Sequence, residues 1–464
     1  MTGGKQQRLR ANTLARAHAD TVPQYDRSAM PGIAHLGFGA FARAHLAVYA
    51  DELLRLGRPA LIRGISIRSR RAEDQLNPQD GLFTVATREP GQDMSLHVVG
   101  ALVSMETGPA AALDALTEPA INLVTLTITE KGYEAAVDPP TPSEPPTSAP
   151  AVIALSLAQR RRAGLAPPVF ASLDNLMQNG TMLRTRVLEA AVTIDPSLAP
   201  WIAHNVVFPS SVVDRMVPAP TEHDLDDIAD RLGLIDRAAV GAEQHRSWII
   251  QSVGGLAPLA DVGVELVEDV APFERRKLWL LNGPHSATAY GGLLAGHDTI
   301  AAAVTDPVLA RFVRGLVDDT LEAAAFPAGL QAAKFADGAL RRFANPALGH
   351  TCAQVGADGS TKLPQRLLPV VAARKKRALD TTGFAVVAAI WIAATAGIAV
   401  RGVDLPQLED PVSGALRAAS RRNALQELSH VALGSLAGNE FTAEVASALP
   451  RLTTEGPALL QEER

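Results

Sequence analysis

Cysteine is almost absent from this chain of 464 residues, which contains only Cys352. One cysteine cannot build a disulfide framework or a thiolate metal cluster, and such low usage fits a reducing compartment. The eleven histidines show no paired spacing of the kind that zinc ligands have, so we expect no metal in the protein. The first residues carry arginines but no apolar stretch, unlike a signal peptide, and we expect the protein to stay in the cytoplasm.

Aromatic residues and an excess of basic charge are also missing. Phe, Trp and Tyr make up 4% of the chain, and the formal net charge is −6, with arginines scattered among acids. This composition indicates neither base stacking nor attraction to phosphate, so we expect no nucleic acid and no membrane as a partner. The uncharged run at residues 384–400 has 17 residues, near the lower limit for a membrane span. It is rich in alanine and lacks an aromatic belt, so we predict a buried helix instead.

The length of the chain predicts two domains, and the sequence pattern changes near residue 270. Residues 1–270 alternate short β-branched runs with amphipathic segments, which predicts a Rossmann-type, doubly wound α/β domain that binds a dinucleotide. Residues 271–464 are rich in alanine and leucine, and we predict a mainly α-helical substrate and catalytic domain there.

Individual elements follow from the same patterns. The predicted strands are residues 33–36, 63–67, 96–103, 122–129, 169–173 and 206–208. The predicted helices of the second half are residues 273–295, 299–325, 329–343 and 384–400. Six prolines fall within residues 138–150, so we predict that this segment is neither helix nor inner strand but an exposed loop inserted in the first domain.

A glycine-rich turn follows the first predicted strand and leads into a helix. It reads GxGxxA and consists of Gly37, Phe38, Gly39, Ala40, Phe41 and Ala42, followed by Arg43. Gly37 permits a tight turn, Gly39 lets the backbone approach a pyrophosphate, and the small Ala42 lets helix and strand pack closely. Free N–H groups at the helix start can then hold phosphates. The pattern predicts a dinucleotide site, with a simple tight turn as the alternative.

The second predicted strand leads into Arg68 rather than into the acid that usually binds the adenosine ribose. Ser69, Arg70 and Arg71 follow, so the segment could receive the 2′-phosphate of NADP, or it could be a solvated loop. Glu73 and Asp74 are close enough in sequence to leave NAD open.

The helical half opens with three polar residues in an apolar segment, namely Lys277, Asn282 and His285. Neighbouring leucines should partly desolvate Lys277 and lower its pKa toward the range of a general base. Asn282 could then steady an alkoxide, and His285 could bind a hydroxyl. On an ideal helix the three side chains share a broad face, although Pro284 predicts a kink or a break within the motif. The alternative is a snorkelling lysine and a core histidine with satisfied hydrogen bonds.

Two more segments carry polar residues at strand ends, where a doubly wound sheet builds its site. Asn175 offers a second carboxamide, and Asp214 offers an acid beside Arg215. An Asx turn and a surface ion pair are the alternative interpretations. Because the Lys277 segment lies just past the domain boundary, we expect an active site in the cleft between the domains.

Taken in order, the motifs resemble the mannitol dehydrogenase family of long-chain polyol and sugar-acid dehydrogenases, and are most similar to its D-mannonate oxidoreductase (fructuronate reductase) branch. The resemblance covers most of the chain. Besides the glycine turn and the Lys277 segment, it rests on Gln79-Asp80-Gly81-Leu82-Phe83-Thr84, Thr129-Glu130-Lys131-Gly132-Tyr133, Asp174-Asn175, Phe208-Pro209, Val213-Asp214-Arg215, Arg342-Phe343-Ala344-Asn345-Pro346 and Asp358-Gly359-Ser360-Thr361-Lys362-Leu363-Pro364.

The resemblance implies that Lys277 is a general base that takes the hydroxyl proton while hydride passes to a nicotinamide, without a metal. It further implies an oxyanion held by Asn175 and Asn282, and substrate contacts from His285, Asp214 and Lys362. The family commonly has an arginine eight positions before that lysine, and here the position is Gln354. Losing a forked cation at a substrate-binding position puts the substrate in doubt more than the chemistry.

We therefore expect an oxidoreductase that uses NAD, with NADP not excluded, on an open-chain sugar acid or polyol. D-mannonate and D-fructuronate are the first choice of substrate pair. The alternatives are a mannitol 2-dehydrogenase or other hexitol dehydrogenase, a β-hydroxyacid-type dehydrogenase, and a non-catalytic protein that binds a dinucleotide. Whether the protein is a monomer or a dimer stays open.

Overall fold

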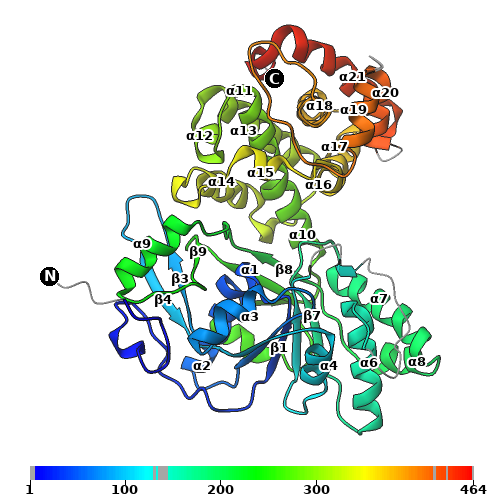
Figure 1. Ribbon diagram of the computed structural model, residues 1–464. Helices are drawn as coiled ribbons and strands as arrows, with labels where there is room; N and C mark the ends of the chain where they lie inside the picture. Colours follow the sequence, from blue (N-terminus) through cyan, green and yellow to red (C-terminus); the bar gives the residue numbers. More distant parts are fainter. Residues whose placement is uncertain (1–5, 129–131, 134–144, 422–424, 435–436, 462–464) are drawn as a thin grey trace, which may run out of the picture. The chain divides into compact units, whose positions relative to one another are not determined.

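The computed structural model describes residues 6–128, 132–133, 145–421, 425–434 and 437–461 of the chain. The chain divides into two compact units, Met1–Ala271 and Pro272–Arg464 (Figure 1). The first unit is built around a parallel sheet and the second from helices, so the predicted fold class, a Rossmann-type α/β domain followed by a mainly helical domain, is confirmed.

A five-stranded parallel sheet forms the centre of the first unit, with the strand order β5-β2-β1-β6-β7. The strands are β1 (Ile33–Leu36), β2 (Ile62–Ser66), β5 (Leu102–Thr107), β6 (Leu123–Leu126) and β7 (Val169–Ser172). Every residue of β1 and of β6 is buried, as expected for parallel strands that are covered on both faces. The order reverses at β1, and ligands of such sheets bind beyond the carboxyl ends of the strands at that reversal.

Two apolar clusters cover the two faces of this sheet, because successive side chains of a strand point to opposite faces. Ile33 of β1 belongs to the cluster that contains α2 (Leu46–Arg55), whereas Leu36 belongs to the cluster that contains α4 (Pro109–Thr117), α6 (Ala149–Arg162) and α7 (Asn179–Ile194) (Figure 1). The other α-helices in the described part of this unit are α1 (Ala40–Ala44), α3 (Arg71–Leu76), α8 (Leu198–Asn205) and α9 (Glu222–Leu232).

Two three-stranded sheets complete the first unit, and the sequence did not predict them. One contains β4 (Ser95–Val99), β3 (Phe83–Thr87) and β9 (Val240–Ala242), and the other contains β11 (Glu265–Val267), β10 (Ser247–Gln251) and β8 (Ser211–Asp214). The turn before β3 is held by the buried Asp236, which accepts hydrogen bonds from Gln79 Nε2 and from the N–H of Thr84. Gln79 therefore has a structural role at this turn.

Three predictions for this unit are wrong in detail. The predicted strand at residues 96–103 is two strands in different sheets, β4 and β5, separated where the N–H of Gly100 donates to Tyr25 and Asp51 side chains. Residues 206–208 are not a strand, and the strand lies further on, at β8. The end of the proline-rich segment is helical, because Pro150 lies in the first turn of α6, where a missing N–H costs nothing. Residues 138–144 of that segment lie outside the described residues.

The second unit consists of helices. They are α10 (Ala271–Lys277), a π-helix η4 (Leu278–Asn282), α11 (Gly283–Ala295), α12 (Ile300–Thr305), α13 (Pro307–Ala323), α14 (Ala332–Phe343), α15 (Cys352–Gly356), α16 (Gly359–Arg366), α17 (Leu368–Lys376), α18 (Thr382–Ala396), α19 (Ser413–Arg421), α20 (Leu425–Leu433) and α21 (Gly438–Glu455). All residues of α18 from Gly383 onward are buried, which confirms the predicted buried helix. Within the described ranges, no helix has both the length and the apolarity to cross a membrane.

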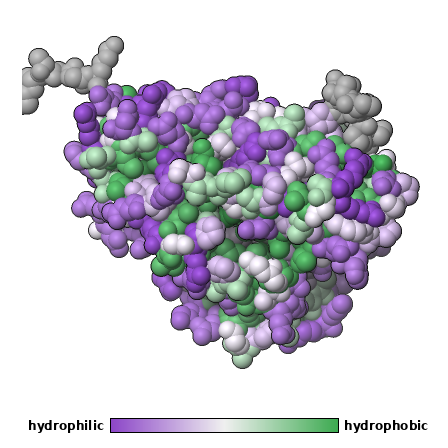
Figure 2. All heavy atoms as spheres, turned by 90° about the horizontal axis from the view of Figure 1, so that it is seen from below, coloured by the Kyte–Doolittle hydropathy of each residue, from purple (hydrophilic) through white to green (hydrophobic). Residues whose placement is uncertain are grey.

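Hydrophilic and hydrophobic residues both contribute to the surface of the molecule. On the face seen in Figure 2, hydrophilic residues predominate at the rim and hydrophobic residues lie between them. Among the described residues, the large hydrophobic side chains with most exposure are Met30, Leu56, Met177, Met182, Val192 and Val207. Two of these, Met177 and Met182, lie just before α7 and in its first turn.

Candidate active site

The glycine turn stands at the carboxyl end of β1, at the reversal of strand order. Gly37 has a φ of 89°, and its N–H donates to the carbonyl of Ile65 at 2.7 Å. A Cβ on Gly37 would come within 2.1 Å of the carbonyl oxygen of Thr127, so only glycine fits there. A Cβ on Gly39 would meet nothing closer than 3.8 Å. The protein itself thus leaves room beside Gly39, as expected where a dinucleotide backbone approaches the turn.

The residues of the glycine turn differ in whether their side chains or only their backbone groups can face a ligand. Phe38 is buried, edge-on to His35 and Phe83, so its side chain belongs to the core and only its backbone can face a ligand. Ala40 and Phe41 supply the first N–H groups of α1. Arg43 is buried and donates to the carbonyls of Gly39 and Ala238, and burial lowers its pKa to about 10.

Arg68 lies just beyond the carboxyl end of β2, the strand next to β1, and is exposed. Its neighbour Arg70 pairs with Glu73 at 2.9 Å on the exposed start of α3. The segment is therefore at the correct edge of the sheet for the adenosine end of a dinucleotide.

One contact near the turn was missed by the sequence analysis. His35 on β1 lies between two threonines, with Nδ1 2.8 Å from Oγ1 of Thr125 and Nε2 2.9 Å from Oγ1 of Thr127. Thr127 Oγ1 in turn donates to the carbonyl of Gly37 at 2.7 Å. The signal in the sequence is an uncharged β-strand with a single histidine two residues before the first glycine.

Asn175 follows β7 and is exposed in a turn that Asp174 anchors. Asp174 accepts hydrogen bonds from Tyr133 Oη at 2.8 Å and from the N–H of Ile128 at 3.3 Å. The buried Asn179 donates to the carbonyls of Asp174 and Ser211, which links this turn to β8. Asn179 and Tyr133 were not predicted as site residues. Thr129, Glu130 and Lys131 of the predicted motif lie outside the described residues.

Asp214 is the last residue of β8 and is 8% exposed. Its Oδ2 lies 3.4 Å from Nε2 of His245. The neighbouring Arg215 is buried and donates to the carbonyls of Ala44 and Glu243, so Arg215 is not the surface residue that the alternative interpretation required. In the first unit, Asn179 thus ties the segments of Asn175 and Asp214 together.

Lys277 and Asn282 stand at the two ends of an unusual turn in the second unit. Lys277 ends α10 and is 8% exposed, and Asn282 ends the π-helix and is 7% exposed. The N–H of Gly283 donates to the carbonyl of Leu278, five residues back. Pro284 explains this pattern, because it has no N–H for the carbonyl of Leu280. The irregularity that Pro284 predicted thus takes the form of a π-turn, a feature that is frequent at functional sites.

His285 follows on the first turn of α11. Its ring stacks on Phe343 with centroids 4.6 Å apart, and its Nε2 is buried without a hydrogen-bond partner within the described residues. Burial, with added repulsion from positive groups, lowers the pKa of His285 to about 3. The cationic groups are Arg366, Lys362 and Arg342, and the ring of His350 also lies close by. The ring is therefore neutral at pH 7, and its unpartnered nitrogen is suited to a substrate hydroxyl.

The remaining two predicted residues lie on α15 and α16. Lys362 Nζ donates to the carbonyls of Val355 and Ala357, so its ammonium is held in place. Gln354 is exposed and closes a capping box with Thr351 at the start of α15. Its amide therefore has a structural partner at the helix end.

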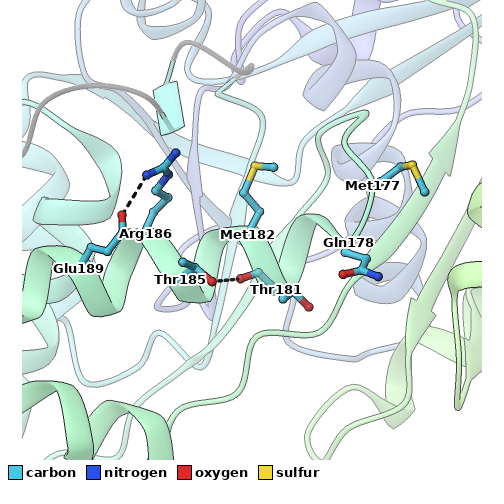
Figure 3. Close-up of a pocket in the computed structure, with 7 residues that line it drawn as sticks. All are labelled: Met177, Gln178, Thr181, Met182, Thr185, Arg186 and Glu189. Carbon is cyan, nitrogen blue, oxygen red and sulfur yellow. Dashed lines mark hydrogen bonds and ion pairs between the residues drawn. The ribbon is translucent and has the colours of Figure 1, made fainter. Parts of the chain in front are cut away.

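A groove of about 340 Å³ lies on the outer side of α7 (Figure 3). Its walls are Met177, Gln178, Thr181, Met182, Thr185, Arg186 and Glu189. Arg186 pairs with Glu189 at 3.0 Å, and none of the predicted site residues lines the groove. In the part of the chain that the structure describes, no three His, Cys, Asp or Glu residues gather as a metal-ligating group.

Known proteins resemble both units. Residues 31–259 match the model of the mannitol dehydrogenase Rossmann domain, and residues 269–452 match that of the mannitol dehydrogenase C-terminal domain. The D-mannonate oxidoreductase of Escherichia coli (strain K12) is 35% identical over 469 residues, which cover 94% of this chain and 96% of the relative. The mannitol 2-dehydrogenase of Cereibacter sphaeroides is 32% identical over 94% of this chain and 97% of the relative.

A solved structure extends the likeness to three dimensions. The ternary complex of Pseudomonas fluorescens mannitol 2-dehydrogenase with NAD and D-mannitol matches with a TM-score of 0.88 at 29% identity. The match covers 98% of this chain and 99% of that chain. The resemblance inferred from the motifs is confirmed: the chain belongs to the mannitol dehydrogenase family of oxidoreductases.

Proposed function

We propose that the protein is a metal-independent, NAD-dependent dehydrogenase that interconverts a secondary alcohol and a ketone on an open-chain sugar acid, with D-mannonate and D-fructuronate as the substrate pair. The observation that carries the proposal is the buried pair Lys277 and Asn282 around a π-turn, directly followed by the unpartnered nitrogen of His285. These groups are a base, an amide donor and a hydroxyl-binding ring within about two and a half turns of helix.

The proposed chemistry uses these groups as follows. Lys277, as the neutral amine, takes the proton of the substrate hydroxyl while the same carbon loses hydride, and the product is a ketone. Asn282 donates its amide N–H to the oxygen as negative charge develops there, and Asn175 is proposed as a second donor. His285 binds a neighbouring hydroxyl, and Asp214 and Lys362 are proposed as further substrate contacts. Lys277 then returns its proton to solvent, and the reverse order reduces the ketone.

The residues of the glycine turn suit a dinucleotide. Gly37 shapes the turn, the space beside Gly39 admits a pyrophosphate, and the first N–H groups of α1, which begins at Ala40, are proposed to hold it. Bound NAD supplies a nicotinamide ring that accepts the hydride. The solved relative with NAD supports this choice of nucleotide. Arg68 keeps NADP as a second candidate because an exposed guanidinium at the end of β2 could meet a 2′-phosphate.

Two observations favour a sugar acid over a polyol. The positive groups around His285 would attract a carboxylate, and the D-mannonate oxidoreductase is 35% identical to this chain. A mannitol 2-dehydrogenase is the second candidate function, supported by the TM-score of 0.88 to a structure with D-mannitol bound.

A substrate panel tests the proposal. Purified protein is assayed in EDTA with NAD and with NADP, on D-mannonate, D-mannitol and a small 3-hydroxy acid, and in reverse on D-fructuronate and D-fructose. We expect the highest kcat/KM with NAD on D-mannonate. Preference for D-mannitol would establish the second candidate instead. Nucleotide binding without turnover of any substrate would contradict an enzymatic function.

The lysine base gives the first mutational prediction. Lys277→Ala should lower kcat by at least about a hundredfold, since general-base catalysis contributes about 10²- to 10⁴-fold, while nucleotide affinity stays within about twofold of wild type. Stopped-flow turnover and nucleotide titration measure the two quantities. Lys334→Ala, at an exposed position of α14, is the matched control and should leave both unchanged. A Lys277→Ala variant with the wild-type kcat would contradict the proposed role of Lys277 as the general base.

A further inference from the structure

We propose that Arg366 is the residue that binds the carboxylate of the substrate and so selects a sugar acid over a polyol. The inference rests on the proposed function and adds a residue that none of the sequence motifs pointed to. Gln354 stands where the family commonly has an arginine, so another cation must bind the substrate carboxylate, and we assign this role to Arg366.

Arg366 lies directly against the segment that carries Asn282 and His285. Its Nη1 donates to Oγ of Ser286 at 3.0 Å, and Ser286 is 1% exposed. The carbonyl oxygen of Arg366 would lie 3.0 Å from a Cβ on Gly283, so the glycine allows the end of α16 to approach the start of α11 closely. This hydrogen bond holds the guanidinium of Arg366 at Ser286, the residue that directly follows His285.

Helix α16 brings a second cation to the same side. Lys362 and Arg366 are four residues apart, which puts both side chains on one face of the helix. His350 adds a third basic group, with its ring 6.0 Å from that of His285. A carboxylate beside His285 would therefore meet several positive groups, whereas the CH₂OH end of a hexitol would gain little from them.

Arg366 is the best suited of these groups to hold a carboxylate. A guanidinium binds a carboxylate through two parallel hydrogen bonds in a fixed plane, whereas an ammonium acts as a point charge. The ammonium of Lys362 already donates to two backbone carbonyls, and the amide of Gln354 serves the cap of α15.

The test compares Arg366→Gln and Arg366→Lys with wild type on D-mannonate and on D-mannitol, which differ only in having a carboxylate or a CH₂OH group at one end. For Arg366→Gln we expect kcat/KM on D-mannonate to fall about 30- to 100-fold, mainly through KM, because a lost charge-assisted contact is of this size. On D-mannitol the change should stay within about threefold, and the KM for NAD should not move. Arg366→Lys should recover part of the loss on D-mannonate.

Ser286→Ala is the second variant, because it removes the group that orients Arg366 and leaves the charge. We expect its KM for D-mannonate to rise several-fold, with an unchanged KM for NAD and an unchanged melting temperature. If Arg366→Gln loses the same factor on both substrates, or loses nothing on D-mannonate, the role of Arg366 is refuted while the proposed function stands. If wild type does not turn over D-mannonate at all, both proposals fall.

Discussion

His35 connects the core of the parallel sheet to the turn that is proposed to hold the nucleotide. The hydroxyl of Thr127 donates its one hydrogen to the carbonyl of Gly37. Its oxygen must therefore accept a hydrogen bond from the N–H at Nε2 of His35. The other ring nitrogen, Nδ1, then accepts from Thr125 in the neutral tautomer. Burial lowers the pKa of His35 to about 3, which keeps the ring neutral at pH 7. A chain of three polar groups thus fixes the carbonyl of the first glycine.

Thr127→Val tests whether this chain positions the turn. The variant keeps the shape of the side chain but leaves the N–H of His35 without its partner and removes one of the two hydrogen bonds to the carbonyl of Gly37, which still accepts from the N–H of Gly39. We expect the dissociation constant for NAD to rise about 5- to 20-fold with kcat within about twofold, and stability to fall by about 1–3 kcal/mol. Thr125→Val is the control: it removes the bond at Nδ1, on the side away from Gly37, and should cost stability but not nucleotide affinity. Equal NAD affinity in the two variants would contradict the positioning role.

At the scale of elements, the sequence predicts best where one local pattern decides the structure. β1, β2, β6 and β7 are short runs with β-branched or other apolar residues, bounded by glycine, proline or polar residues, and were found within a few residues, and α18 was recognised from its uncharged run. The break between β4 and β5 depends on Asp51 and Tyr25, which are distant in sequence, so the run 96–103 gives no sign of it. The short strand β9 has three residues and pairs with β3 across more than a hundred residues, beyond any local pattern.

The π-turn gives a prediction at this scale. Pro284→Ala supplies an N–H that can donate to Leu280 and so favours a regular α-helix through Lys277 and Asn282. A regular helix rotates the two side chains relative to each other, because the π-turn holds one extra residue. We expect kcat to fall at least tenfold, whereas unfolding free energy should change by less than about 1 kcal/mol, since the regained hydrogen bond offsets lost packing.

Steady-state kinetics and thermal unfolding measure these two effects. Pro450→Ala provides the comparison, because Pro450 also lies inside a helix, α21, that carries none of the predicted site residues. Its kcat should equal that of wild type. An undiminished kcat in Pro284→Ala would mean that the turn is a packing feature without influence on the reaction.

At the scale of the whole molecule, composition and pattern were enough to predict an α/β part followed by a helical part. For the candidate site, sequence patterns and the family resemblance predict which residues take part but not the contacts between segments that are distant in sequence. Lys277, Asn282 and His285 form one segment, but Arg366 reaches Ser286 across 80 residues, and its contact depends on how α16 packs against α11. The four-residue spacing of Lys362 and Arg366 was a local sign of it, but Arg366 lies outside the motif that ends at Pro364. The irregular segments that tie Asn175 to β8 through Asn179 had no such sign.

Buried histidines should make the stability of the molecule depend on pH. Burial lowers the pKa of His35, His45 and His285 to about 3, against about 6.5 in an unfolded chain. Between these values the unfolded state binds protons that the folded state does not, so stability falls as the pH drops below about 6.5. Each histidine contributes a slope of up to about 1.4 kcal/mol per pH unit. Asp236 acts in the opposite sense, because burial raises its pKa.

A variant at one histidine separates these contributions. His45→Phe keeps a ring that can stack on Phe41, whose centroid lies 4.9 Å away, and removes one group that must stay neutral in the folded state. We expect the unfolding free energy of the variant, measured by urea titration from pH 7.5 to pH 5, to fall less steeply than that of wild type, by up to about 1.4 kcal/mol per pH unit. The variant loses the hydrogen bond from Nε2 to the carbonyl of Ser247, which lowers stability equally at every pH and leaves the slope unaffected. Parallel curves for the two proteins would show that His45 takes up its proton in the folded state as readily as in the unfolded chain.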